Sequence, residues 1–373
     1  MKSRFLFKLK QHLAHYRIVE WYRRQRSASG KVFSPEMLEG AEIVTIVWPP
    51  AIPKPRIGLV KDCSQMLYTP PYAYWPRYER FLKNNAFPFE FYDISRSDWL
   101  TQSERFDVVV WRPGSDPATQ YEAESKIGIL ELKGKKCFPS FSQIWSYEDK
   151  IRQYYLLAIN HIPVIPTFIS HNRDEAISYV RTAPLPIVSK LTNGSGSMGV
   201  TLFTSRRSAE AFVRRVFAAG SSTYWSYLRQ KDYVYFQEFI EDASFDLRVI
   251  VVGERLFGYY RMCPPHDFRA SGAGIFVKKE IPPEALSLAW QTAQIFNTPQ
   301  IAVDMLYSPK RGSFFIIETS IFFQIDTAEQ LKVDDIPGYY QRQGDRFVFI
   351  PGRFWVQELA LKQFLEITYL RSS

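Results

Sequence analysis

The stretch from Pro186 to Val200 brings together residue types that can bind phosphate. A short apolar run ends in Lys190, a loop with three glycines follows, and a second apolar run starts at Val200. Such a loop can fold back between two strands and turn its backbone N–H groups inward, where they and the ammonium group favour anions. Glycine suits this loop because it tolerates positive φ and a close approach of the backbone to a ligand. The alternative is a glycine-rich hairpin that binds nothing.

Other phosphate-binding loops do not fit the sequence. It contains no Gly-x-x-x-x-Gly-Lys-Ser/Thr stretch, which excludes a P-loop, and no Gly-x-Gly-x-x-Gly that opens a helix after an N-terminal strand. The His-Arg-Asp and Asp-Phe-Gly motifs of protein kinases are also missing. A phosphate ligand at Lys190 would therefore belong to another kind of site.

Carboxylates and arginines follow the loop on expected strands. Asp304 and Glu318 lie on adjacent strands of one expected hairpin. Oxygen ligands on neighbouring strands can share a hard cation such as Mg²⁺ while triphosphate oxygens complete its shell. Asp246 and Arg248 point to the same side of their strand because side chains alternate, and Arg269 follows the preceding hairpin. Taken alone, each of these residues could instead cap a strand or form a structural ion pair.

The composition indicates a globular protein of the reducing cytoplasm. A chain of 373 residues can bury a large core in two or three lobes, and 46% hydrophobic with 16% aromatic residues argues against disorder. No apolar run approaches the roughly 18 residues that span a bilayer, and we expect no secretory signal at the charged start. Three scattered cysteines and five unpaired histidines indicate neither a disulfide framework nor a zinc site.

The net charge of +9 is concentrated near the N-terminus. Residues 1–31 hold nine Lys/Arg and one Glu, which accounts for +8 of the +9. The remaining residues are close to neutral, so the sequence does not indicate a broad nucleic-acid-binding surface. Apolar residues within 2–26 recur at a spacing of three or four, which predicts a basic amphipathic helix. This helix either packs on its own protein or contacts an anionic surface, such as a membrane or an acidic partner.

The elements that must position these residues are short strands and helices. Alternating strand and helix patterns between Arg56 and Ser140 predict an open α/β sheet. Strands are expected on both sides of the glycine loop, and hairpins around Gly253 and the 308–312 turn. The expected strands are 56–61, 87–93, 106–111, 136–138, 164–169, 187–190, 200–203, 233–240, 246–252, 255–261, 301–307 and 313–319, and the expected helices are 76–85, 119–130, 147–160, 208–219, 284–296 and 356–369.

Together these residues resemble the ATP-grasp superfamily, most closely its carboxylate–amine ligases of the ribosomal-protein glutamate ligase and glutathione synthetase kind. The resemblance covers roughly 136–330 and depends on the order of several motifs, which is more specific than the loop alone. Those motifs are Asp149-Lys150, the 190–199 strand and loop, Gln237-Glu238-Phe239-Ile240, Asp246-Leu247-Arg248-Val249, Asp267-Phe268-Arg269, Val303-Asp304 and Ile317-Glu318.

The resemblance implies a mixed α/β architecture in which two α+β subdomains clamp ATP behind an open α/β domain. The implied parts are a basic arm at 1–48, the first domain at 56–140, the ATP-grasp domain at 141–345 and a C-terminal helix at 346–373. Within the ATP-grasp domain, a small lid would occupy about 165–240 and the metal-binding subdomain about 241–345.

It also implies roles for single residues. Lys150 and Lys190 would hold the α- and β-phosphates, Arg269 would contact the γ-phosphate and the acyl phosphate, and Asp246 would lie near the ribose. Asp304 and Glu318 would hold one or two Mg²⁺ ions. The remaining nucleotide contacts would come from the loop residues Asn193, Gly194, Ser195, Gly196, Ser197 and Gly199, from the hinge residues Gln237, Glu238, Phe239 and Ile240, and from Arg248.

The reaction implied by the resemblance joins a small-molecule or peptide carboxylate to an amine. A carboxylate oxygen attacks the γ-phosphorus of ATP to give an acyl phosphate, and the amine then displaces phosphate. Because an anion attacks an anion, lysines, arginine and the metal would supply most of the stabilisation. The alternative is an ATP- or ADP-binding module with weakened or phosphotransferase-like activity, docked to a membrane or acidic partner by residues 1–31.

Two positions and one short stretch depart from the family pattern. Ser320 stands where an Asn is usual, and we place it with the metal ligands although a hydroxyl is a poorer ligand than an amide carbonyl. Ser271 stands at the position of another usual Asn. The apolar stretch 321–323 predicts an unusually apolar acceptor site.

Overall fold

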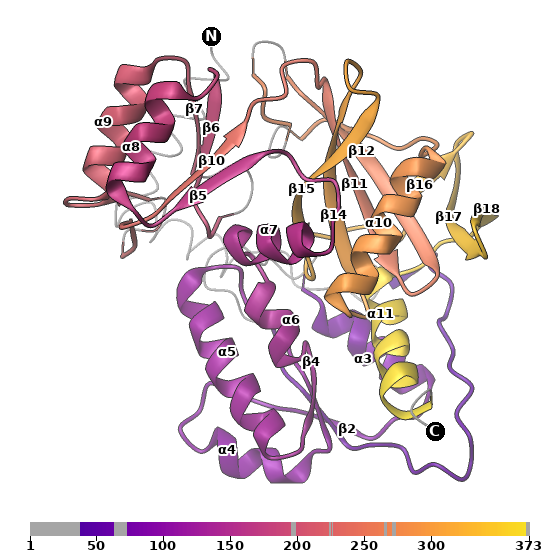
Figure 1. Cartoon of the computed structure of the whole chain (residues 1–373). Helices are drawn as coiled ribbons and strands as arrows, with labels where there is room; N and C mark the ends of the chain where they lie inside the picture. Colours follow the sequence, from indigo (N-terminus) through magenta and orange to yellow (C-terminus); the bar gives the residue numbers. More distant parts are fainter. Residues whose placement is uncertain are drawn as a thin grey trace.

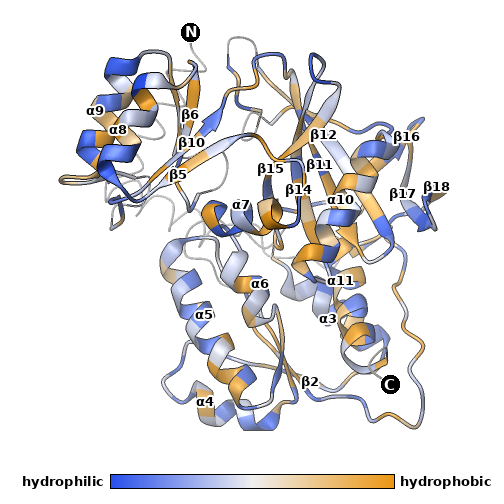
Figure 2. Ribbon diagram, viewed as in Figure 1, coloured by the Kyte–Doolittle hydropathy of each residue, from blue (hydrophilic) through white to orange (hydrophobic). Residues whose placement is uncertain are grey.

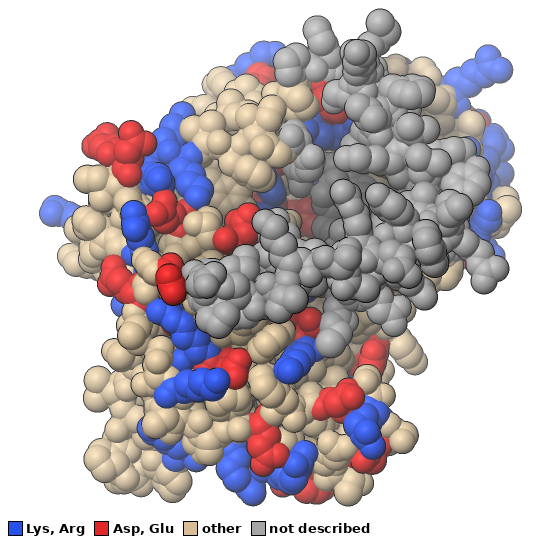
Figure 3. All heavy atoms as spheres, turned by 180° about the vertical axis from the view of Figure 1, so that it is seen from behind, with Lys and Arg blue, Asp and Glu red and all other residues tan. Residues whose placement is uncertain are grey.

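The computed structural model describes residues 38–62, 73–194, 199–223, 225, 227–264, 267–270 and 274–370 (Figure 1). The expected helix at 2–26, most of the basic arm, the loop residues Ser195, Gly196 and Ser197, and Ser271 lie outside this range. No helix among the described residues is both long and apolar enough to cross a membrane. On the face shown in Figure 3, acidic and basic side chains are interspersed over the described surface.

The first lobe is the expected open α/β domain. Its four strands are all parallel and run in the order β2-β1-β3-β4, and the central strands are fully buried runs of apolar residues. Such runs suit parallel strands that are covered on both faces. The elements are β1 (Ile57–Leu59), α3 (Trp75–Asn84), β2 (Phe89–Phe91), α4 (Trp99–Gln102), a 3₁₀ turn (Ser103–Arg105), β3 (Val108–Val110), α5 (Pro117–Leu132), β4 (Lys136–Phe138) and α6 (Phe141–Ser146).

The second part is a small α+β subdomain, which we call the lid. Its antiparallel sheet has the order β5-β10-β6-β7, and a helical layer covers one face. In Figure 2 the outer surfaces of α8 and α9 are blue, while the strands beneath them carry orange, hydrophobic positions. The elements are β5 (Thr167–Ser170), α8 (Arg173–Thr182), β6 (Ile187–Lys190), β7 (Val200–Phe203), α9 (Arg206–Val216), β8 (Ser221–Ser222), β9 (Arg229–Gln230) and β10 (Val234–Glu238).

The third part is an eight-stranded antiparallel sheet, with α7 at the lid side and α10 and α11 packed on it (Figure 1). Its main path is β15-β14-β11-β12-β17-β16. The elements are α7 (Lys150–Ile159), β11 (Phe245–Val252), β12 (Arg255–Met262), β13 (Phe276–Val277), α10 (Pro283–Phe296), β14 (Ile301–Ser308), β15 (Ser313–Ser320), β16 (Leu331–Val333), β17 (Ile336–Gln343), β18 (Arg346–Pro351), α11 (Val356–Leu365) and a final π-helical turn (Glu366–Leu370).

Two hydrophobic cores hold these parts together. One core is continuous from the first lobe into the large sheet, while the lid has a separate core between its strands and α8 and α9. The first lobe docks through Tyr74, whose hydroxyl donates to Phe323 O at 2.6 Å and accepts from Phe323 N at 3.1 Å. Phe322 packs edge-to-face against the Tyr74 ring. The lid is therefore the part whose core is independent of the rest.

The structure corrects several expectations. The 321–323 stretch does not form an apolar acceptor site, because Ile321, Phe322 and Phe323 are at most 4% exposed and belong to the shared core. The helix expected from residue 147 begins at Lys150, because Asp149 caps it. The strand expected from residue 164 begins at Thr167, after Pro166, which has no N–H to donate.

The end of the chain also differs from the prediction. Residues 346–351, expected within a C-terminal helix, form β18, which pairs with β17 across a two-residue turn at Gly344-Asp345. Gly344 has a φ of 62°, which glycine adopts without strain. The helix α8 was not predicted, and neither were β16–β18. The other predicted strands and helices of the described part are confirmed to within a few residues.

Candidate functional site

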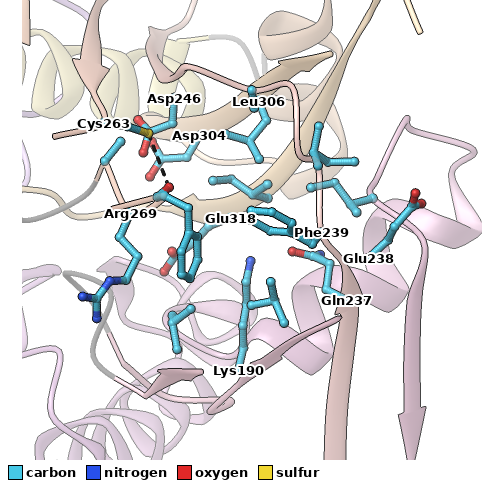
Figure 4. A pocket seen from close by; sticks show the side chains of 18 of the residues that line it. Lys190, Gln237, Glu238, Phe239, Asp246, Cys263, Arg269, Asp304, Leu306 and Glu318 are labelled. Carbon is cyan, nitrogen blue, oxygen red and sulfur yellow. Dashed lines mark hydrogen bonds between the residues drawn. The ribbon is translucent and has the colours of Figure 1, made fainter. Parts of the chain in front are cut away.

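A pocket lies between the lid and the large sheet, where side chains from both layers face each other (Figure 4). Its lid side carries Val188, Lys190, Gly194 and Val200, and its sheet side carries residues of β11, β12, β14 and β15. The pocket brings together most of the described residues that the sequence predicts for the site. These are Lys150, Lys190, Gly194, Gln237, Glu238, Phe239, Ile240, Asp246, Arg269, Asp304 and Glu318.

A β-bulge turns Glu318 into this pocket. In β14 and β15, Met305 pairs with Ile316, but Asp304 pairs with Glu318, so Ile317 is an extra residue on β15. With a regular register Asp304 would face Ile317, and Glu318 would point to the opposite face of the sheet. Bulges often re-aim side chains in this way next to functional sites. Asp304 and Glu318 are therefore neighbours on the pocket face, as predicted from the hairpin.

Lys150 reaches the pocket from the first turn of α7. Asp149 caps this helix by accepting from the N–H groups of Ile151 and Arg152. The Lys150 Nζ donates to Gly194 O at 2.6 Å and to Glu318 Oε1 at 3.0 Å. Burial disfavours the ammonium charge, but attraction by nearby carboxylates, first Glu318, outweighs it and raises the Lys150 pKa. Lys150 therefore stays charged inside the protein.

Lys190 enters from the other side, at the end of β6, and points into the pocket (Figure 4). Burial dominates here, so the pKa of Lys190 falls to about 8, and the attraction of Glu318 only partly opposes this. The glycine loop follows directly. Gly199, at its far end, has a φ of 78°, and a Cβ there would lie 2.7 Å from the Cβ of Leu191. Only glycine fits this position without displacement.

Two arginines hold Asp304 in place. Arg248 donates to both its oxygens at 2.7 Å, and Arg261 donates to Oδ2 at 2.7 Å. Arg261 also bonds Asp246, its direct cross-strand partner. Although burial acts in the opposite direction, the arginines hold the pKa of Asp304 well below its usual range. The pKa of Asp246 rises to about 6, mainly through burial.

The hinge residues lie at the end of β10, with Gln237 and Glu238 in the strand and Phe239 and Ile240 directly after it. The Gln237 side chain donates to Thr167 Oγ1 at 3.0 Å, and the Glu238 N–H donates to Pro166 O at 2.9 Å. The Glu238 carboxylate pairs with Arg311 and is directed away from the pocket in Figure 4. Phe239 contacts Phe268 edge-to-face at 5.4 Å between ring centroids. Glu238 therefore lines the pocket while its carboxylate points away from it.

Arg269 and the other predicted residues lie at the edges of this arrangement. The Arg269 guanidinium is held by the carboxylate of Asp267, with Nη2–Oδ2 at 2.7 Å, and lies at the edge of the pocket in Figure 4. Arg248 lies behind Asp304, which it binds. Asn193 is half-buried in the loop beside Gly194. Ser320 is 7% exposed, and its hydroxyl donates to Phe322 O at 2.5 Å.

Two charged residues at or next to the site, Arg261 and Glu148, were not predicted from the sequence. Arg261 could have been found, because a two-residue turn at Gly253-Glu254 pairs it with Asp246. Glu148 had no such signal. It is 4% exposed, its Oε1 lies 3.4 Å from Ser320 Oγ, and its Oε2 has no hydrogen-bond partner among the described residues. Burial and then repulsion by Glu318 raise the pKa of Glu148 to about 7.

The donor set of the pocket fits a Mg–nucleotide. Two ammonium groups suit phosphate oxygens, and the carboxylates of Asp304 and Glu318, which line the same pocket, suit a cation. No three His, Cys, Asp or Glu residues gather as a metal cluster in the described part of the chain. Mg²⁺ does not require such a cluster, because one or two carboxylates with phosphates and water are usually enough.

Comparison with known proteins shows which family this chain resembles. The family described as "RimK-like ATP-grasp domain" matches residues 147–335. The glutamate–LysW ligase ArgX of Sulfurisphaera tokodaii is 26% identical over 211 residues, which are 56% of this chain and 71% of that protein. The ribosomal protein bS6–L-glutamate ligase of Salmonella paratyphi B is 27% identical over 238 residues, or 62% and 74% of the two chains.

Solved structures show the same fold. D-cycloserine synthetase DcsG superposes with a TM-score of 0.55 at 16% identity, covering 84% of this chain and 99% of that one. A RimK domain ATP-grasp protein from Sphaerobacter thermophilus gives 0.51 at 15% identity, with 71% and 90% covered. With half of its length matched by the family and with both lysines, the hinge and the carboxylate hairpin in one pocket, this chain belongs to the RimK-like ATP-grasp ligases.

Proposed function

We propose that the protein uses ATP and Mg²⁺ to join a carboxylate to an amine through an acyl phosphate. The observation that carries the proposal is the pocket itself, in which Lys190 enters from the lid while Lys150 of α7 binds Glu318 of the large sheet. The two relatives named above are described as ligases of glutamate to LysW and to ribosomal protein bS6. We therefore propose an amino acid as one substrate, and a carboxylate on a peptide, protein or small metabolite as the other.

The nucleotide would lie with its base at the hinge and its phosphates between the lysines. The apolar side chains of Ile165, Val188 and Leu306 line the hinge end of the pocket and suit a purine. Backbone groups of Phe239 and Ile240 are the proposed contacts to its edge, since the Glu238 N–H already bonds Pro166. The two ammonium groups would neutralise phosphate oxygens while a substrate carboxylate approaches the γ-phosphorus.

Arg269 and the carboxylates complete the proposed mechanism. Arg269 would leave Asp267 and stabilise the charge that develops on the transferred phosphoryl group. Glu318 would hold Mg²⁺, which withdraws charge from the phosphates, and Asp304, whose oxygens accept from Arg248 and Arg261, would lie beside it. A closed lid would keep water away from the acyl phosphate until the amine attacks. The relatives are named as ligases, so we do not favour the alternative of a nucleotide-binding module with weakened catalysis.

Release of ADP and phosphate tests this function. We expect purified protein with Mg–ATP to release both products only when an acceptable carboxylate and amine are present together. Glu318→Gln should lower that turnover by on the order of a hundredfold or more while the fold survives, because the proposed Mg²⁺ loses a carboxylate ligand and no longer neutralises the phosphates. Glu254→Gln is the control, since Glu254 pairs with Arg342 beside the exposed β11–β12 turn. Full turnover by Glu318→Gln would contradict the assignment.

A further inference from the structure

Glu148 is a buried acid that has no role in the proposed reaction. It lies between Tyr147 and the α7 cap, with 4% of its surface exposed. Its Oε2 has no partner among the described residues, and its Oε1 receives only a long contact of 3.4 Å from Ser320 Oγ. Buried carboxylate oxygens are normally satisfied, and leaving one unpaired is costly. A ligand that completes this oxygen would remove the cost.

The position of Glu148 links it to the metal-binding face of the sheet. Glu318 and Ser320 are two residues apart on β15 and so project from the same face, toward Glu148. Among the charged groups that act on Glu148, Glu318 repels it, while Lys150 and Arg248 attract it. The backbone of Glu148 has a φ of 57°, a conformation that is uncommon for a residue other than glycine. Glu148 therefore meets this face of β15 at Ser320, two residues from Glu318.

We propose that Glu148 is a direct carboxylate ligand of the divalent cation that accompanies the nucleotide, in a two-carboxylate seat formed with Glu318. This inference rests on the proposed function, because the nucleotide phosphates would supply further oxygen ligands. Mg²⁺ is commonly bound by one or two carboxylates together with substrate phosphates and water.

The hydrogen bonds that the neighbouring oxygens already make explain why the cation would need a ligand from Glu148. Both oxygens of Asp304 already accept from Arg248 and Arg261, so a cation there would compete with guanidinium N–H groups. The Ser320 hydroxyl is engaged with Phe322 O. Glu318 is left as the accessible carboxylate of the hairpin, and Glu148, which contacts Ser320 on the same face of β15, is the second acid beside it.

Manganese binding tests the proposal. The free Mn²⁺ signal in electron paramagnetic resonance would be titrated with protein saturated with ADP. Glu148→Gln should weaken Mn²⁺ binding by roughly 10- to 100-fold or more, since even the loss of an outer-shell partner of a metal costs that much. ADP binding without metal should be unchanged. Mn²⁺ should also raise the thermal midpoint of the original protein but not that of Glu148→Gln.

Glu358→Gln is the matched control. Glu358 is equally buried, and its Oε2 is also without a partner among the described residues, but it lies in α11 and pairs with Arg80. Its replacement should leave Mn²⁺ affinity unchanged. If Glu148→Gln binds Mn²⁺ as tightly as the unmodified protein, Glu148 is a structural acid and the proposal is wrong.

A second measurement needs no substitution. Fe²⁺ in place of Mg²⁺, with ascorbate and peroxide, cleaves the backbone next to its ligands. We expect cuts within 147–149 and within 317–319, mapped by mass spectrometry. Cuts within 303–305 and 317–319 but none at 147–149 would overturn the proposal even if Glu148→Gln did not fold. This second cleavage pattern in an active enzyme would refute only the assignment of Glu148 as a metal ligand. A protein that does not bind Mg–nucleotide at all would refute the proposed function itself.

Discussion

Lys150 and Lys190 have the same side chain and line the same pocket, yet their proton affinities differ. Lys150 touches Glu318, and the carboxylates around it raise its pKa. Lys190 makes no such contact among the described residues, and burial lowers its pKa to about 8 from an ordinary 10.5. A triphosphate would supply the missing negative charge at Lys190. We therefore expect nucleotide binding to increase the protonation of Lys190.

Nucleotide binding should take up a proton between about pH 8 and 9, because phosphate oxygens would raise the pKa of Lys190 above its free value. Affinity for ADP should fall as the pH rises through this window. Calorimetry in two buffers with different ionisation enthalpies measures the uptake. Lys190→Met should abolish it and lower turnover by on the order of a hundredfold, whereas Lys150→Met should retain it. Buffer-independent heats would contradict this assignment.

The same shift has a consequence for folding. Between about pH 8 and 10.5 the unfolded chain holds more protons at Lys190 than the folded protein does. Stability therefore rises with pH in this window, and below it the buried charge is a constant cost. This contribution should disappear in Lys190→Met.

The arginine pair around Asp304 should be worth more to the fold than any surface ion pair. Asp304→Asn would leave Arg248 and Arg261 buried without their shared carboxylate. We expect the free energy of unfolding to fall by about 3–5 kcal/mol, as for other broken buried pairs. Urea unfolding measures the change, and Glu254→Gln should stay within about 1 kcal/mol as an exposed pair does. A small loss for Asp304→Asn would show that the arginines find other partners.

At the scale of elements, α7 places Lys150 and is tied to the glycine loop by its cap. Asp149 Oδ1 accepts from the N–H groups of Ile151 and Arg152 and from Thr192 Oγ1 at 2.9 Å. Thr192 stands two residues after Lys190, so one carboxylate fixes the helix start and the loop start together. The two lysines are thereby positioned relative to each other.

Asp149→Ala should lower stability by about 1 kcal/mol through loss of the cap. Asp149→Asn should be close to the original protein, because the asparagine side chain keeps an oxygen that accepts from the helix N–H groups. Thermal unfolding measures both. If the two variants lose stability equally, the negative charge of Asp149 matters and not its capping geometry.

At the scale of the whole molecule, the two cores divide the chain into a rigid base and a lid. The base combines the first lobe with the large sheet, and Tyr74 fastens one to the other. The separate core of the lid permits it to move without unpacking the base. Such motion is what a site that admits a nucleotide and then excludes water requires.

Tyr74→Phe should lower the free energy of unfolding by about 1–3 kcal/mol, because the buried backbone groups of Phe323 lose their partner. Tyr78→Phe is the matched control. Tyr78 is also buried, but its hydroxyl has no partner among the described residues, so its removal should cost little or nothing. Equal losses in the two variants, measured by urea unfolding, would show that Tyr74 contributes only by packing.

Short-range patterns in the sequence were enough to predict the parts of the site that depend on neighbours in the chain. Strand alternation, turn residues and the order of motifs identified the two hairpins, the glycine loop and most of the residues that line the pocket. These features are local, since the period of a strand and the conformation of a turn depend on neighbours in the chain. The pairing of Asp246 with Arg261 was contained in the same local information.

Which of these groups come into contact, and which of them are buried or charged, depends on three-dimensional packing. The bulge at Ile317 brings Glu318 to the pocket face, and no residue type in that stretch marks it. The arginines on Asp304, the burial of Phe322 and Phe323 against Tyr74, and the approach of Glu148 to Ser320 all join segments far apart in the chain. Burial and charge at such meetings arise from packing in three dimensions, which periodicity along one strand does not encode.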